Sequence, residues 1–140
     1  MKILLAVDGS AFTKKMLAYV TTHPELFGTD NDFTVLTVQP PLPPRARAMV
    51  GKEAVDGYYA EESQKVLDPV MKFLQRHSLK VRGAVKVGHA AEVIAKTAET
   101  GKYDMLIMGS HGHGSRANLV MGSVATKVLA HSTVPLLLVR

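Results

Sequence analysis

The chain has 140 residues, of which 46% are hydrophobic and 21% charged, a length and composition that predict one compact domain over residues 1–140. It contains no cysteine, which excludes disulfides and thiolate metal sites. The formal net charge of +5 comes from scattered basic residues, and few aromatic side chains are present to stack on bases, so we expect no nucleic-acid partner.

Five short apolar or alternating segments predict β-strands. They run from Lys2 to Asp8, Asp32 to Val38, Leu79 to Val87, Asp104 to Gly109 and Val134 to Arg140. The first, fourth and fifth are apolar almost throughout, which is typical of parallel strands covered on both faces. The apolar run at the start of the chain is too short for a signal peptide or a membrane span, so we expect a cytoplasmic protein without a membrane partner.

Apolar stripes with helical spacing lie between these strands. The four stripes comprise Phe12, Met16, Tyr19 and Val20; Val66, Val70, Phe73 and Leu74; Ala91, Ile94, Ala95 and Ala98; and Val124, Val128 and Leu129. The resulting βαβαβαβαβ order predicts a mostly parallel sheet with helices on both faces. Pro69 predicts a kink or a boundary in the second helix. The proline-rich and then polar stretch from Gln39 to Gly57 predicts a surface loop.

A glycine-rich segment follows the fourth predicted strand. From Gly109 the chain has two residues before Gly112, nine more before Gly122, and then Ser123 ahead of the last helical stripe. Glycines let backbone amides approach an anion and tolerate positive φ, and a helix N-terminus favours phosphate. The pattern is neither a P-loop nor a dinucleotide fingerprint. Its spacing alone is equally typical of an ordinary turn between a strand and a helix.

The segments around this pattern resemble the universal stress protein family over essentially the whole chain. "ILLAVDGS" is similar to the family's first strand, "VGHAAEVIAKTAE" to its glycine turn and third helix, and "TVPLLLVR" to its closing strand. The resemblance implies a Rossmann-like, adenine nucleotide alpha hydrolase-like α/β fold. This is a three-layer open twisted sheet of five parallel strands in the order 3-2-1-4-5, with helices on both faces. The complete glycine pattern resembles the branch of the family that binds ATP.

The resemblance also implies a set of residues for binding ATP with Mg²⁺. The adenosine would lie against Ala6 and Asp8, and the adenine would meet the backbone of Val38. The ribose and phosphates would be held by Gly109, Ser110, His111 and Gly112, followed by the variable residues His113, Gly114 and Ser115. The phosphate tail would be gripped by Gly122, Ser123 and Val124. We expect phosphate oxygens and water, rather than protein ligands, to hold the Mg²⁺ ion.

Several of these residues also allow other interpretations. Asp8 and Ser10 are typical of a turn and of a helix N-cap. His111 and His113 lack the cysteine or acidic neighbours that a structural zinc site needs. Ser110 is not placed in the G-x-S-x-G turn that a serine nucleophile needs in this kind of fold. We therefore expect neither a catalytic residue nor a protein-held metal.

The closing strand bears on assembly and function. An apolar edge strand needs a partner, and the resemblance implies a homodimer through Val134 to Val139. The favoured function is a dimeric, ATP-binding sensor or switch in the stress response, with at most slow ATP hydrolysis. Two alternatives stay open: an interaction module that binds no nucleotide, and an enzyme that cleaves a nucleotide at its α-phosphate.

Overall fold

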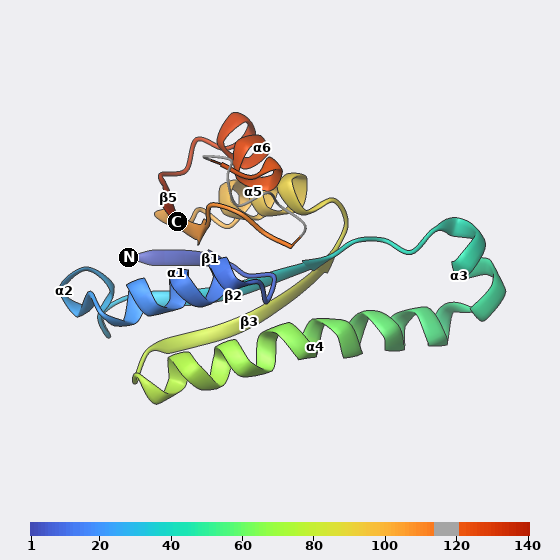
Figure 1. Ribbon diagram of the computed structural model, residues 1–140, viewed down its shortest axis with the longest axis horizontal. Coiled ribbons are helices and arrows are strands. Elements are labelled where there is room, and N and C mark those ends of the chain that lie inside the picture. Colours follow the sequence, from blue (N-terminus) through green and yellow to red (C-terminus); the bar gives the residue numbers. More distant parts are fainter. Residues whose placement is uncertain (114–120) are drawn as a thin grey trace.

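The computed structural model describes residues 1–113 and 121–140. Figure 1 shows a parallel sheet with helices on both sides. The elements are β1 (Lys2–Ala6), α1 (Ala11–Thr21), α2 (Pro24–Phe27), β2 (Asp32–Gln39), α3 (Pro44–Val50), α4 (Lys52–Arg76), β3 (Lys80–Val87), α5 (Ala90–Thr100), β4 (Met105–Gly109), α6 (Ser123–His131) and β5 (Leu136–Val139). The observed order β3-β2-β1-β4-β5 confirms the predicted 3-2-1-4-5 sheet.

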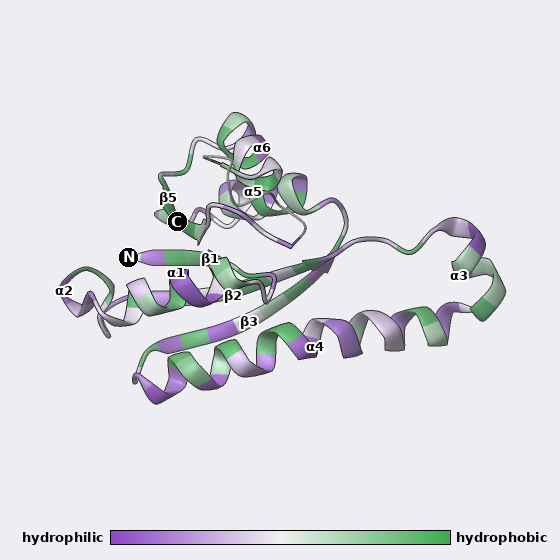
Figure 2. Cartoon of the chain, viewed as in Figure 1, coloured by the Kyte–Doolittle hydropathy of each residue, from purple (hydrophilic) through white to green (hydrophobic). Residues whose placement is uncertain are grey.

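The sheet separates two hydrophobic cores, which explains why the central strand is apolar from Ile3 to Ala6. Side chains alternate between the faces of a strand. Ile3 and Leu5 of β1 therefore pack with α1 and α4, whereas Leu4 and Ala6 pack with α5 and α6. The edge strand β3 is largely exposed, and Figure 2 shows it banded with hydrophilic and hydrophobic residues.

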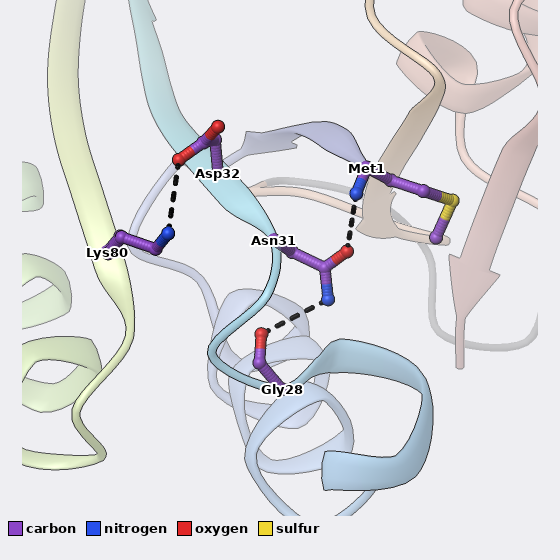
Figure 3. Close-up of polar contacts among 5 residues, drawn as sticks. All are labelled: Met1, Gly28, Asn31, Asp32 and Lys80. Atoms are coloured by element: carbon purple, nitrogen blue, oxygen red, sulfur yellow. Dashed lines mark hydrogen bonds and ion pairs between the residues drawn. The ribbon is translucent and has the colours of Figure 1, made fainter.

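Strands β1, β2 and β3 start level with one another at the amino edge of the sheet. The Met1 amino group donates to Asn31 Oδ1 at 2.9 Å, and Asn31 Nδ2 donates to the Gly28 carbonyl at 3.1 Å. Asp32 Oδ1 lies 3.9 Å from Lys80 Nζ on the neighbouring strand (Figure 3). These contacts anchor the turn before β2 to the first residues of β1 and β3.

The opposite, carboxyl edge of the sheet is uneven. Ala6, the last residue of β1, pairs with Leu36 of β2 and with Met108 of β4. β2 and β3 continue together to the pair Gln39 and Val87. β1 and β4 end earlier than β2 and β3. The loops that follow β1 and β4 therefore begin side by side, next to the longer strands β2 and β3.

The predicted surface loop from Gln39 to Gly57 is wrong in most of its length. The structure forms α3 and the first turns of α4 there. Pro44 stands at the first position of α3, where a missing N–H is tolerated. Helix α3 and the start of α4 project beyond the sheet (Figure 1). Val55 is the sole buried residue between residues 44 and 62, all of which the structure describes.

Two further expectations about the helices need correction. Pro69 marks no boundary, because α4 is a continuous helix of 25 residues that includes it, and Leu67, Val70 and Leu74 are buried around it. Packing of an apolar face thus outweighs the local cost of the proline. A kink at Pro69 stays a prediction. Leu129, assigned to the last apolar stripe, is 56% exposed. No helix in the described ranges is long and apolar enough to cross a membrane.

Candidate functional site

A narrow inner cavity of about 80 Å³ lies at the carboxyl edge, between the loops that follow β1 and β4. Ligands of open parallel sheets bind at this edge, where the strand order reverses. The structure brings most of the predicted site residues together around the cavity: Ala6, Asp8, Val38, Gly109, His111, Gly112, Gly122 and Val124. Residues separated by more than 100 positions therefore share one wall.

The inner cavity adjoins a wider outer groove of about 810 Å³. Asp8, Val38, Gly112 and Val124 line both spaces, and His113 and Ser123 line the groove alone. The groove also receives Lys65 from α4 and Lys127 from α6, together with the acidic residues Glu62 and Glu92. Its walls consequently carry both signs of charge, with two lysines on different helices.

Asp8 is held in one position by the turn that starts α1. Asp8 Oδ1 accepts hydrogen bonds from the Ser10 amide and from the Thr13 hydroxyl, both at 2.9 Å. Burial by itself would raise the pKa of Asp8, but these hydrogen bonds outweigh it and hold the pKa below its ordinary value. Ser10 is the N-cap of α1, as predicted, and its Oγ accepts from the Thr13 amide at 3.4 Å.

His113, which lines the outer groove, links the loops that follow β1 and β4. Its Nε2 lies 2.7 Å from the Asp8 carbonyl oxygen, and its backbone amide donates to Asp8 Oδ2 at 3.3 Å. Both contacts connect residues 105 positions apart. These two contacts with Asp8 hold the loop after β4 against the loop after β1.

The glycines of the loop after β4 are required by close packing. A Cβ on Gly109 would lie 2.7 Å from Phe12 Cβ, and one on Gly112 would lie 2.5 Å from Asp8 Oδ2. Gly109 and Gly112 do not adopt the positive φ that glycine tolerates. Positive φ occurs instead at Gly9 (79°), next to Asp8, and at Gly88 (153°), which lines the outer groove.

Ser110 lies behind the cavity wall. It is 1% exposed and lines neither the inner cavity nor the outer groove. Its amide donates to the Val139 carbonyl at 2.8 Å, its carbonyl accepts from the Gly122 amide at 2.7 Å, and its Oγ lies 2.8 Å from His111 Nδ1. Ser110 therefore joins β5 and the start of α6 to the site. Gly114 and Ser115 lie outside the described residues.

The N-terminus of α6 opens onto the outer groove. Gly122 is its N-cap with extended backbone (φ −76°, ψ 169°), and the amide of Gly122 is directed inward to Ser110. The first intrahelical amide bond runs from Thr126 to the Gly122 carbonyl. The amides of Ser123, Val124 and Ala125 consequently precede any intrahelical acceptor, and they form the positive end of the helix.

Sequence patterns missed other parts of the two walls. Ile94 and Met108 line the inner cavity, but a periodic apolar residue looks the same in a cavity wall as in a core. Lys65 and Lys127 line the outer groove, yet each is one of many exposed lysines in a helical segment. Only the packing of α4 and α6 around the loops identifies these residues.

Comparisons with known proteins point to one family. The model of the universal stress protein family matches residues 1–140. A universal stress protein of Synechocystis is 32% identical over 139 residues, which are 99% of this chain and 42% of that protein. One of Thermus aquaticus is 30% identical over 99% of this chain and 97% of its own length. The chain thus spans less than half of the Synechocystis relative.

Solved structures show the same fold. A protein of Methanocaldococcus jannaschii matches with a TM-score of 0.82 at 29% identity, over 99% of this chain and 94% of that one. A protein of Arabidopsis thaliana with AMP bound and one of Archaeoglobus fulgidus in complex with dAMP each match with a TM-score of 0.68 at 18% identity. These alignments cover 99% and 100% of this chain, and 90% and 98% of the respective structures. At 18% identity the likeness shows the fold alone.

Proposed function

The chain belongs to the universal stress protein family, and from that premise we propose that it binds an adenine nucleotide across the inner cavity and the outer groove. The observation that carries the proposal is their junction. An apolar cavity between Val38, Ile94 and Met108 opens directly onto the N-terminus of α6. The apolar cavity suits a flat base, and the amides at the N-terminus of α6 suit a phosphate.

The chemistry of each wall fits a different part of a nucleotide. The inner cavity is lined mainly by small and apolar residues, and Asp8 at its mouth accepts hydrogen bonds as a sugar hydroxyl could require. The outer groove provides the amides of Ser123 and Val124 with Lys65 and Lys127 as counter-charges. The relatives with AMP and dAMP support an adenine base as the ligand.

We propose ATP with Mg²⁺ as the form that fills both spaces, because the groove has room beyond a first phosphate and is lined by Lys65 and Lys127 as well as by Glu62 and Glu92. In the described part of the chain no three histidine, aspartate or glutamate side chains form a metal cluster. The ion would therefore arrive on the phosphate oxygens, where it neutralises charge. The chain's own task would be to orient the phosphates on α6.

The proposed role is binding rather than catalysis. Asp8 is the acidic residue among those that line the inner cavity, and its lowered pKa makes its carboxylate a weak general base. Bound nucleotide would connect the loops after β1 and β4 with α6 and β5, since Ser110 joins β5 to the site. Such a linkage suits a sensor or switch that acts through a dimer formed at β5.

Calorimetric titration of ATP with Mg²⁺ into the wild type and Gly122→Val tests the proposal. We expect a micromolar Kd, about −8 kcal/mol, in the wild type, with AMP and dAMP competing and GTP not. Extended φ and ψ at Gly122 admit valine, whose side chain would crowd the phosphates, so we expect binding to be lost. Gly57→Val, at an exposed glycine with open space around it, is the matched control.

Two results would contradict the proposed function. Absence of heat and of thermal stabilisation in folded wild type would leave an interaction module that binds no nucleotide. Rapid release of pyrophosphate or AMP during the titration would instead support the enzyme that cleaves at the α-phosphate.

A further inference from the structure

A second groove lies on the other side of Lys65, between α1 and α4. It has a volume of about 480 Å³, within the range of small-molecule sites, roughly 300–1,000 Å³. Lys65 and Val66 line both this α1–α4 groove and the outer groove of the nucleotide site. Thr13 also lines the inner cavity, and the remaining residues of the α1–α4 groove line neither space of the nucleotide site.

The floor of the α1–α4 groove is apolar. Leu17 and Val70 are 6% and 5% exposed and belong to the core under α1 and α4. Val66 and Phe73 are only partly buried and lie at the margin of that core. The groove therefore presents hydrocarbon surface to water, and covering that surface with an apolar ligand is favourable.

The charges around the α1–α4 groove are of one sign. Lys14, Lys65 and Arg76 line it, and none of its lining residues, all of which the structure describes, is acidic. Arg76 Nε is engaged with the Lys72 carbonyl at 3.3 Å, and Lys65 Nζ lies 3.2 Å from Glu62. Within the described ranges, no carboxylate lies within ion-pair distance of Lys14 Nζ. Lys14 is accordingly the cation best placed to receive an anion.

The end of the α1–α4 groove that Lys14 and Lys65 line adjoins Gly9. A Cβ on Gly9 would lie 3.5 Å from Val66, so α4 approaches the start of α1 at this point. Lys14 belongs to the first turns of α1, and Lys65 directly precedes Val66 on α4. Lys14 and Lys65 therefore flank the same end of the groove, while Phe73 lies two helical turns further along α4.

We propose that the α1–α4 groove binds a single-chain anionic amphiphile of the fatty-acid class. Its carboxylate lies at Lys14 and Lys65, and its chain covers Leu17, Val66, Val70 and Phe73. The groove's volume is that of a small-molecule site, whereas a stable protein partner buries about 800 Å² on each side. The apolar floor lies between Lys14 and Lys65 at one end and Arg76, which is engaged with the Lys72 carbonyl, at the other. This arrangement matches a ligand with one chain and one negative head group at the two lysines.

Calorimetric titration of decanoate, below its micelle concentration, into the nucleotide-free protein tests this assignment. We expect decanoate to bind and decyltrimethylammonium, which has the same chain but the opposite charge, to bind at least about tenfold more weakly. Lys14→Glu should weaken decanoate binding by about tenfold or more. Lys15→Glu is the matched control, because Lys15 Nζ lies over the Phe12 ring instead, 4.8 Å from its centroid.

A second pair of variants tests the place of the chain. Ala18 is exposed on α1 and lines the groove, so Ala18→Phe should fill the groove and abolish decanoate binding. Ala60→Phe, at an exposed alanine of α4 outside the groove, should leave it unchanged. Circular dichroism and the titration with ATP verify that each variant is folded, independently of decanoate.

Three outcomes would overturn the proposal. They are the absence of decanoate binding to folded wild type, equal affinity for the cationic amphiphile, and equal losses in Lys14→Glu and Lys15→Glu. Co-sedimentation with anionic phospholipid vesicles without any binding of free decanoate would also overturn it, because the ligand would then be a membrane surface.

Discussion

Asp8 has two tasks that sequence patterns present as alternatives. Its carboxylate closes the turn into α1 through Ser10 and Thr13, and the same residue lines the inner cavity. A residue that is rigid because of local hydrogen bonds can present its remaining oxygen to a ligand in a fixed direction. The structural interpretation of Asp8 as a turn residue is confirmed, and its contact with nucleotide stays a prediction.

The pH dependence of stability should reveal the Asp8 hydrogen bonds. At pH 7 we expect Asp8→Asn to lower the free energy of unfolding by about 1–2 kcal/mol, because a charged acceptor is lost. The pKa of Asp8 is lower in the folded protein than its ordinary value. Its stabilisation is therefore complete above the unfolded pKa, about 3.9, and is lost as the pH falls through the folded pKa.

Urea unfolding of the wild type and Asp8→Asn at pH 7, 5 and 3 measures this effect. The difference between their free energies of unfolding should become smaller as the pH falls below about 4. A difference of the same size at all three pH values would mean that the carboxylate charge contributes nothing beyond the amide that replaces it.

At the scale of elements, α4 consists of two unequal parts. Its carboxyl-terminal part packs Leu67, Val70 and Leu74 against the sheet. Its amino-terminal part projects with α3 into water, and Met49 of α3 is 80% exposed. A segment with few buried apolar contacts opens at a lower free energy than the global unfolding.

Limited proteolysis should distinguish the two parts of α4. We expect trypsin to cut after Arg45, Arg47 or Lys52 much earlier than after Lys96, which is exposed but lies in α5 against the sheet. Mass spectrometry of early time points identifies the sites. Cleavage at Lys96 as early as at Arg47 would show that the projecting segment is no less stable than the sheet.

The sequence predicts elements well where local pattern and burial agree. The continuous apolar run of β1 predicts a strand covered on both faces, and the buried stripe of α5 predicts a helix that covers the sheet. The strand order, in contrast, is implied by the family resemblance. Prediction from sequence fails where long-range packing determines the secondary structure, as at Pro69 and in the segment that forms α3. The same limit applies to the site: Gly109 and Gly112 are visible as a motif, whereas Lys65 reaches the groove only because of where α4 packs.

For the whole molecule, β5, the edge strand of the sheet, is the proposed route to a dimer. The Leu106 amide donates to the Pro135 carbonyl and the Ser110 amide to the Val139 carbonyl. Because hydrogen-bonding groups alternate along a strand, the amides and carbonyls of Leu136 and Leu138 face away from β4. These groups could extend the sheet into a second copy.

Leu138→Pro tests the dimer at β5. Proline removes an edge donor and leaves the ladder with β4 intact, since edge strands tolerate it. We expect the wild type to sediment as a dimer and the variant as a monomer with unchanged circular dichroism. A wild type that stays monomeric at high micromolar concentration would contradict the proposal, as would a variant that remains a dimer.

The central position of β1 affects how the chain is made. β1 is synthesised before the other four strands, but the edge of β1 that pairs with β4 stays unpaired until β4 is made. Lys2 bonds to Asp104 across 102 positions, and Ile3 pairs with Met105. Ribosomes add about 5–20 residues per second, so this edge stays unpaired on the order of 5–20 s. During that interval the apolar residues of β1 are exposed and can pair with other nascent chains, so chaperones that cover β1 should raise the yield of folded protein.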